Sequence, residues 1–287
     1  MSPAFSFIIL TFNEEQHLPR LLNSIAQLNA PIFILDSGST DDTLKIAESF
    51  GANVKYHPFE NHPKQWDYAL KNFEVQTPWI IGLDADQMVT PELLELLINF
   101  DDEAYHNVEG IYFNRKNIFK GKWIKHGGYY PKYQLKMFRY GIGYSDLNEN
   151  MDHRFIVSGN TAIWKKGHIL EENLKENEIR FWIDKHNRYS DLVANEEIER
   201  MLNLRKQTIK PKLFGHPYQR TAYLKSLWWK LPRFFRPFIY FSYRMTLQLG
   251  FLDGKTGILF HFLQGFWFRL IVDIKISEKL NQANKNG

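Results

Sequence analysis

Residues 1–100 alternate short apolar runs with amphipathic segments of helical spacing, and this alternation constrains the fold more than any other feature. A continuous apolar run such as 79–83 has the length and composition of a buried strand. Repeated strand and helix predict a mostly parallel sheet with helices on both faces, an α/β fold. The expected strands are 4–11, 31–35, 53–56 and 79–83, and the expected helices include 18–25, 43–50, 64–72 and 91–99.

Capping residues predict where two of these helices begin. Asn13, with Gln16 three residues later, is expected to cap the first helix as a capping box. Thr90 followed by Pro91 predicts the start of the fourth helix, since proline is favoured in the first turn.

The regular alternation ends near residue 100. Segments 110–114 and 133–139 predict an antiparallel extension of the sheet, and residues 176–208 read as helical. From about residue 218 the chain reads as aromatic-rich helices broken at Pro232 and Pro237.

Charge is distributed unevenly along the chain. Residues 201–287 hold 15 Lys and Arg against 3 Asp and Glu, whereas residues 1–200 carry a net negative charge. The absence of Cys excludes disulfides, thiolate metal sites and thiol nucleophiles. No signal peptide is expected, and the longest uncharged stretch of the tail, 256–268, is shorter than the roughly 18 apolar residues that span a bilayer.

Carboxylates and an amide follow three of the expected strands. Ligands of parallel sheets bind at the carboxyl ends of strands, so these groups are expected to converge at one edge. Asp84 and Asp86 offer hard oxygen ligands that suit Mg²⁺ or Mn²⁺ beside a diphosphate. The alternative for this pair is an ordinary polar turn between strand and helix.

Asp36 ends the second strand and begins a turn rich in hydroxyl side chains. Its carboxylate can accept hydrogen bonds from a base or a ribose. For Ser39, Thr40 and Asp42 we favour a simpler interpretation, in which Ser39 or Thr40 caps the next helix and Asp42 complements its dipole.

These motifs, in this order and spacing, resemble the nucleotide-sugar half of glycosyltransferase family 2, whose members have the GT-A fold. The resemblance implies a Rossmann-like, mostly parallel central sheet flanked by helices, followed here by a C-terminal aromatic-rich helical extension. It implies that Asp36 holds uracil or ribose and that Asp84 and Asp86 hold the sugar diphosphate and a Mg²⁺ or Mn²⁺ ion. The nucleotide-sugar residues implied in this way are Thr11, Asn13, Glu14 or Glu15, Asp36, Lys64, Gln65, Asp67, Asp84 and Ala85. Asp67 stands where many relatives have Asn, and it lacks the two N–H donors of that amide.

The second half narrows the resemblance to the lipopolysaccharide-core β-1,4-glucosyltransferase group, through segments 185–190, 249–257 and 264–267. An inverting transfer of a hexose, expected to be glucose from UDP-glucose, to a lipid-linked core oligosaccharide is then implied. Transfer to a polyprenyl phosphate or to another cell-surface glycan is the alternative within enzymes. The catalytic domain is expected to span 1–215, with a nucleotide-sugar half at 1–100 and an acceptor half at 101–215, and the membrane-associating extension is expected to span 216–287.

An inverting transferase needs a carboxylate that takes the proton of the attacking hydroxyl. Relatives place this base some distance beyond the paired aspartates, and the candidates here are Glu172 first and Glu149 second. The alternative for either glutamate is a solvated charge on a helix. The segment 185–190 could present a cation and a Tyr to an anionic acceptor or to the diphosphate, or it could be a solvated helical turn.

Basic and aromatic residues interleave in the tail, for example over 228–236. Such a helix suits the inner leaflet of the cell membrane, because aromatics settle at the headgroups and each Lys or Arg near an anionic leaflet contributes about 1 kcal/mol. We therefore expect a cytoplasmic protein that binds the inner face of the membrane peripherally. The other interpretation of the tail is a buried cap on the catalytic domain, and the two are compatible. A non-catalytic membrane- or nucleic-acid-binding protein is the rival class, but no RNA-binding motif is present and no nucleic acid is expected as a partner.

Overall fold

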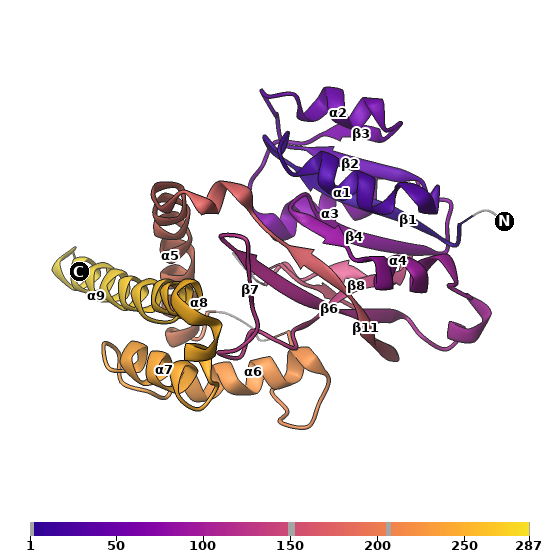
Figure 1. Cartoon of the computed structure of the whole chain (residues 1–287). Coiled ribbons are helices and arrows are strands. Elements are labelled where there is room, and N and C mark those ends of the chain that lie inside the picture. The colour runs from indigo at the N-terminus through magenta and orange to yellow at the C-terminus, as the bar shows by residue number, and fades with distance from the viewer. Residues whose placement is uncertain (1–2, 149–152, 205–207, 287) are drawn as a thin grey trace. The chain divides into compact units, whose positions relative to one another are not determined.

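The computed structural model describes residues 3–148, 153–204 and 208–286 (Figure 1). Its backbone contacts divide the chain into two compact units. The described residues of 1–118, 131–147 and 152–174 form unit 1, and those of 119–130, 148–151 and 175–287 form unit 2. The expected division at residue 215 concerns function, and it stays a prediction.

Unit 1 contains nearly all of the strands and the first four helices. The strands are β1 (Phe5–Thr11), β2 (Ile32–Asp36), β3 (Asn53–Tyr56), β4 (Trp79–Asp84), β5 (Gln87–Val89), β6 (Gly110–Phe119), β8 (Tyr133–Arg139), β9 (Tyr144–Ser145), β10 (Phe155–Ile156) and β11 (Thr161–Glu171). The helices are α1 (Leu18–Ile25), α2 (Thr43–Ser49), α3 (His62–Asn72) and α4 (Pro91–Ile98), with short 3₁₀ turns at Ala26–Leu28 and Glu103–Tyr105.

The central sheet runs in the order β3-β2-β1-β4-β8-β6-β11-β5. The first four strands are parallel neighbours. β8 pairs antiparallel with β4 and with β6, β6 is parallel to β11, and β5 closes the edge antiparallel to β11. The predicted α/β class with the mostly parallel sheet of a GT-A fold is therefore confirmed, and so is its antiparallel extension.

The core of unit 1 explains why its strands read as continuous apolar runs. All seven residues of β1 are buried, because helices cover both faces of a parallel sheet. α1 contributes Leu18, Leu21, Leu22 and Ile25, the four apolar positions of its sequence pattern.

Two of the expected helix caps are wrong, although both helices begin at the expected residues, Leu18 and Thr43. α1 begins at Leu18 with His17 at the cap position, and Asn13 lies upstream with a positive φ of 56°. The Asn13 side chain serves another loop, where its Oδ1 accepts from the Thr40 backbone N–H, so it is not available as a helix cap. α2 is preceded by Asp42 rather than by Ser39 or Thr40. Thr90 does cap α4, since its hydroxyl accepts from the Leu93 N–H.

Unit 2 is mainly helical. Its elements are the short strand β7 (Lys122–Ile124), a 3₁₀ turn at Leu174–Asn177, α5 (Ile179–Met201), α6 (Pro217–Trp228), α7 (Arg236–Met245), η4 (Gly250–Asp253), α8 (Gly254–His261), the π-helical turn η5 (Phe262–Trp267) and α9 (Phe268–Asn286). α5 packs along α9 through Val193, Ala194, Val272 and Ile276. The predicted aromatic-rich helical extension is present, and α5 is shorter at both ends than the expected 176–208.

One helical run of unit 2, Gly250–Ala283, is long and apolar enough to cross a membrane by length and composition. The expectation that the tail holds no such segment is wrong. The longest uncharged stretch underestimates the length of an apolar helix that continues through a few charged residues. A core helix passes the same test, and 44% of the most apolar window is buried within the structure.

Candidate functional site

The strand register brings the three sequence motifs to one edge of the unit 1 sheet. β1 lies between β2 and β4, Thr11 is directly opposite Asp36, and Leu10 is directly opposite Asp84. The expected convergence at the carboxyl ends of adjacent parallel strands is therefore observed.

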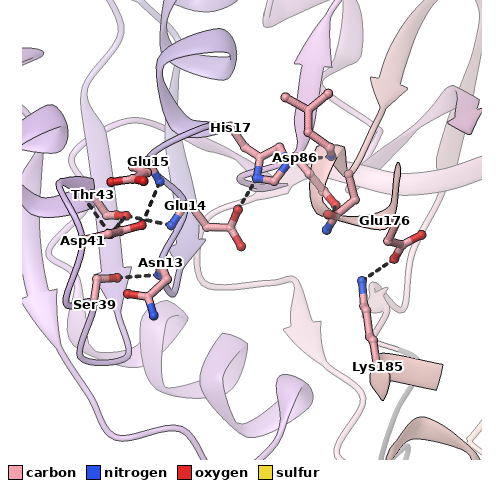
Figure 2. A network of polar contacts seen from close by, with 12 residues as sticks. Asn13, Glu14, Glu15, His17, Ser39, Asp41, Thr43, Asp86, Glu176 and Lys185 are labelled. Atoms are coloured by element: carbon pink, nitrogen blue, oxygen red, sulfur yellow. Dashed lines mark hydrogen bonds and ion pairs between the residues drawn. The ribbon is translucent and has the colours of Figure 1, made fainter. Parts of the chain in front are cut away.

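The loops that follow β1 and β2 are held together by reciprocal hydrogen bonds (Figure 2). The Asn13 N–H donates to Ser39 Oγ at 2.8 Å, and the Glu14 N–H donates to Thr43 Oγ1 at 2.7 Å. Further along, the Glu15 N–H donates to Asp41 Oδ2 at 3.2 Å. Backbone donors of the first loop thus bond to side-chain acceptors of the second, and these bonds fix the two loops at this edge of the sheet.

Asp36 is buried, with 2% exposure, and its carboxylate organises this edge. Oδ1 accepts from the N–H groups of Gly38 and Ser39 at 2.8 and 2.7 Å. Oδ2 accepts from the hydroxyls of Thr11 and Ser39 at 2.9 and 2.5 Å. Because a carboxylate offers about four acceptor positions, all of them serve the loop in this structure. A direct contact of Asp36 with uracil or ribose stays a prediction, and it would replace or share one of these bonds.

His17 ties the first loop to the chain that follows β11. Its Nε2 accepts from the Leu174 N–H at 2.8 Å, so the neutral ring carries its proton on Nδ1 and donates to Glu14 at 2.5 Å (Figure 2). Glu14 therefore faces His17, whereas Glu15 Oε2 accepts from the Asp42 N–H on the side of the second loop. Which of the two glutamates lies against a nucleotide stays a prediction.

Asp84 ends β4 in a strongly cationic environment. The amine of Lys136 lies 3.1 Å from Oδ2, and Nε2 of His62 lies 3.3 Å from Oδ1. Burial pushes the pKa of the Asp84 carboxyl upward, but Lys136 and His62 outweigh burial and hold it well below its usual range. Although 26% of the side chain is exposed, the Oδ1 atom is buried and has no well-formed hydrogen bond.

His153 adds a neutral ring to this neighbourhood. It stacks on Trp66 and meets His62 edge to face, with ring centroids 5.1 and 5.4 Å away. Burial and the nearby His62 lower the pKa of His153 well below its ordinary value, so the ring is uncharged at neutral pH.

Asp86 and Glu172 lie close together through the backbone. The Glu172 N–H donates to the Asp86 carbonyl at 3.0 Å, and Asn173 Nδ2 donates to Asp86 Oδ2 at 3.2 Å. The Glu172 carboxylate is paired with Arg20 at 2.5 Å. The structure therefore brings the first candidate base beside the paired aspartates, while the second, Glu149, lies outside the described residues.

Gln87 links Asp84 to Glu171 across the end of β5. Its Oε1 accepts from the Asp84 N–H at 3.2 Å, and its Nε2 donates to Glu171 at 2.8 Å. Burial raises the pKa of Glu171, but Arg115, 2.6 Å away, outweighs it and the net pKa is lowered. Glu171 is therefore an ionised, fully engaged group that fixes the end of β11.

The three predicted residues of α3 have different environments. Gln65 is buried and donates to Ser37 Oγ and to the His57 carbonyl, each at 3.0 Å, so it supports the loop after β2. Lys64 pairs with Glu60, and Asp67 pairs with Lys71, on the more exposed part of the helix. Trp66 is fully buried, as its helical spacing predicts.

The donor set at Asp84 and Asp86 fits a metal that arrives with a diphosphate. In the part of the chain that the structure describes, no three His, Asp or Glu side chains are grouped to hold an ion by themselves. Mg²⁺ is commonly held by one or two carboxylates together with substrate phosphates and water. The buried Oδ1 of Asp84 lacks a well-formed hydrogen bond, so it is an oxygen that such an ion could use.

Sequence reasoning missed several residues of this site, foremost Lys136, Gln87 and Arg115. Lys136 did carry a signal, because it lies between buried Leu135 and Met137 in a strand, where a lysine needs a partner. Arg115 pairs with Glu171 across 56 residues, and no local pattern marks it, whereas Gln87 bonds both to nearby Asp84 and to distant Glu171.

The segment 185–190 lies on α5 in unit 2. Lys185 pairs with Glu176 at 2.7 Å and lies over the ring of Tyr189, while His186 and Ser190 are buried. Its role toward an acceptor stays a prediction.

Comparison with known proteins identifies the family. The model of Glycosyl transferase family 2 matches residues 6–166. The lipopolysaccharide core biosynthesis glycosyltransferase LpsC of Rhizobium meliloti is 26% identical over 265 residues, 90% of this chain and 89% of LpsC. An uncharacterized glycosyltransferase of Rickettsia conorii is 32% identical over 93 residues, 32% of each chain. Among solved structures, S. aureus TarS 1–349 in complex with UDP covers 99% of this chain and 92% of its own at 16% identity, with a TM-score of 0.46, too low to carry an argument. Since the family model spans more than half of the sequence and reaches from β1 into β11, the chain belongs to glycosyltransferase family 2.

Proposed function

We propose that this glycosyltransferase moves a hexose, expected to be glucose from UDP-glucose, to a lipid-linked core oligosaccharide with inversion at the anomeric carbon. The observation that carries the donor assignment is the alignment of Thr11, Asp36 and Asp84 at the ends of three adjacent parallel strands. The acceptor class is supported by the 90% coverage of the chain in its alignment with LpsC, whose name places that protein in lipopolysaccharide core synthesis.

The residues around Asp84 have distinct tasks in such a reaction. The carboxylates of Asp84 and Asp86 would bind a Mg²⁺ or Mn²⁺ ion, which would neutralise charge on the departing diphosphate. Lys136 keeps Asp84 ionised over the working pH range, and Gln87 fixes its backbone. The reciprocal bonds between the loops after β1 and β2 orient the nucleotide without reorganisation.

Glu172 is the proposed general base. The acceptor hydroxyl attacks the anomeric carbon as the bond to the diphosphate breaks on the opposite face, and Glu172 takes the hydroxyl proton. Its position beside the Asp86 backbone supports this role, and its pair with Arg20 would have to open to accept the proton.

The protein is proposed to work at the inner face of the cell membrane as a peripheral, cytoplasmic enzyme. Support comes from the excess of Lys and Arg and the 17 aromatic residues in 201–287.

Calorimetric titration tests the donor assignment. The protein is titrated with UDP, UDP-glucose and GDP-mannose, with and without Mn²⁺, and the titration is repeated with Asp84→Ala. We expect Mn²⁺-dependent binding of UDP and UDP-glucose that is lost in the variant. Absence of binding to every nucleotide would overturn the proposed function.

A further inference from the structure

The segment 234–262 of unit 2 has its charges inside and its apolar side chains outside. Four of its charged or titratable residues, Arg236, Arg244, Asp253 and His261, are at most 3% exposed. Lys255 is the one exposed charged side chain of this segment, all of which the structure describes. By contrast, these large apolar side chains are 39–75% exposed: Phe234, Phe235, Phe238, Ile239, Tyr243, Leu247, Leu249, Phe251, Leu252, Ile258, Leu259 and Phe262.

The exposed apolar side chains follow helical spacing. On α7 they are Phe238, Ile239 and Tyr243, preceded by Phe235 at the cap. On α8 and its continuation they are Ile258, Leu259 and Phe262. Each helix therefore exposes an apolar stripe, whereas a surface helix of a water-exposed domain exposes its polar face.

These stripes belong to one surface, because α7, η4, α8 and η5 contact one another. Phe238 of α7 packs against Phe266 with centroids 4.7 Å apart, and Phe241 lies 6.1 Å from Phe262. The turn between the helices continues the surface with Leu247, Leu249, Phe251 and Leu252. We call this surface, residues 234–262, the apolar hairpin.

Buried polar contacts hold the apolar hairpin in this orientation. Arg236 bonds to Asp273 and to Glu197, the latter at 2.7 Å, and the Arg244 guanidinium donates to the Gly127 carbonyl at 3.0 Å. Asp253 pairs with His126 at 2.7 Å. Arg236 and Arg244 are thus held inside unit 2, and Lys255 is the exposed basic residue of the hairpin.

We propose that the apolar hairpin inserts into the headgroup and upper acyl region of a lipid leaflet, so that membrane binding is driven by apolar burial rather than by the net positive charge. Helices with one apolar face bury it about 5–10 Å into that boundary. This inference deepens the proposed peripheral location of the protein. It rests on the proposed function only for which leaflet is bound, because binding to lipid requires neither the sugar donor nor the acceptor.

The charge of the sequence that contains the apolar hairpin favours a lipid surface over a second copy of the chain. In the described residues 208–277, both carboxylates, Asp253 and Asp273, are buried. The exposed cations of this range are Lys210, Lys212, Arg220, Lys230, Arg233 and Lys255. A symmetric dimer would bring together two copies of a segment whose exposed charges are all positive, whereas an anionic leaflet complements them.

The same buried pairs indicate that the hairpin lies on the membrane rather than across it. Within the run Gly250–Ala283, Asp253, His261 and Asp273 are buried in unit 2, where Asp273 pairs with Arg236 and the neutral His261 ring lies 3.2 Å from Asp253. A spanning helix would have to break these contacts and expose the buried polar groups to hydrocarbon.

Vesicle flotation with the full chain tests the inference. The probes are vesicles of phosphatidylcholine alone and of phosphatidylcholine with about 30% phosphatidylglycerol, at low and at about 1 M salt. The apolar variant is Phe251→Ser with Leu252→Ser. The matched control is Ile98→Ser with Ile142→Ser, which removes two exposed apolar side chains from unit 1, and a charge variant carries Arg233→Gln with Lys255→Gln.

We expect the apolar variant to bind either vesicle about tenfold or more weakly, with unchanged UDP binding and an unchanged melting temperature. The control should bind as the wild type does, and the charge variant should lose about threefold on anionic vesicles only. Binding that high salt abolishes, or an apolar variant that binds like the wild type, would overturn insertion.

Two further outcomes also count against it. Resistance to alkaline carbonate extraction would show a spanning helix. The wild type could also sediment as a dimer without detergent and the apolar variant as a monomer, while neither protein binds vesicles. That result would show that the apolar hairpin is a self-association surface. Because UDP binding is measured separately, failure of vesicle binding leaves the transferase proposal intact, and failure of UDP binding leaves the membrane result intact.

Discussion

At the scale of single residues, the site is defined by how each carboxylate is paired. The oxygens of Asp36 accept hydrogen bonds from its own loop and from the end of β1, and those of Glu171 contact Arg115 and Gln87. Asp84 and Glu172 face cationic partners that a substrate or an ion could replace. Asp84 and Glu172 are therefore the carboxylates whose partners the proposed reaction would exchange.

Lys136→Met should make ligand binding depend on pH. Without the lysine, burial of Asp84 is opposed mainly by His62, so the pKa of its carboxyl should rise. As the pH falls, Mn²⁺-dependent UDP binding by the variant should weaken at a higher pH than it does in the wild type. Calorimetry over a series of pH values measures the difference, and Lys136→Arg, which keeps the charge, is the control. A flat profile in the methionine variant would contradict the role assigned to Lys136.

Glu172→Gln should separate catalysis from binding. The amide is nearly isosteric but cannot take a proton, so kcat should fall by about 10²–10⁴ while the Kd for UDP stays unchanged. Steady-state assays with UDP-glucose and a core-oligosaccharide acceptor measure the first, and calorimetry measures the second. Arg20→Gln is a useful companion, because it frees the carboxylate and should leave substantial activity. A Glu172→Gln enzyme of wild-type activity would move the base elsewhere.

At the scale of elements, the loops after β1 and β2 behave as one unit. Each donates backbone N–H groups to the side chains of the other, and Asn13 takes a positive φ of 56° to do so. Asparagine adopts the left-handed region of φ and ψ more readily than most residues, which gives a physical reason for an asparagine at position 13.

Replacement of Asn13 distinguishes its backbone role from its side-chain role. Asn13→Ala forces alanine into the left-handed region and should destabilise the protein by about 1–2 kcal/mol relative to Asn13→Gly. Both variants lose the bond from the Thr40 N–H and should bind UDP more weakly than the wild type. Urea unfolding and calorimetry measure the two effects. Equal stability of the two variants would show that the strain at this position is negligible.

At the scale of the whole molecule, both units bury ionisable groups, and their titration couples stability to pH. Burial and the neighbouring Arg244 lower the pKa of His261 to about 4, and Asp253 only partly opposes them. Burial likewise lowers the pKa values of His153 and His186. These rings are neutral in the folded protein and take up protons readily once it unfolds.

Stability should therefore fall as the pH drops from about 6.5 to about 4. In this window the unfolded chain binds more protons than the folded chain, so the free energy of unfolding decreases with falling pH. For His261 alone the loss is about 3 kcal/mol at most. Calorimetric melting temperatures across the window measure it, and His261→Gln, which can hydrogen-bond but not titrate, should show a shallower slope. An identical slope in the variant would mean that His261 contributes little.

The sequence predicted much of unit 1 because the signals for its strands and helices lie in contiguous residues. Continuous apolar runs gave the parallel strands, and spacing gave the buried face of α1. The caps expected for the first two helices were wrong because the Asn13 N–H bonds to Ser39 and the Thr40 N–H bonds to Asn13, so these side chains connect the two loops. Apolar composition also could not show which side of the tail helices faces solvent, because both alternatives contain the same residues.

By itself the sequence determined the α/β class, the family, and the strand ends where Asp36 and Asp84 stand, because strand periodicity and motif spacing are properties of contiguous residues. Only the tertiary structure decided which groups pair with them: Lys136 with Asp84, Arg20 with Glu172, Arg115 with Glu171. It also decided that Arg236, Arg244 and Asp253 lie inside unit 2, whereas Phe235, Phe238 and Phe251 are exposed. The physical reason is that ion pairs and burial depend on distances between residues far apart in the chain, and folding alone sets those distances.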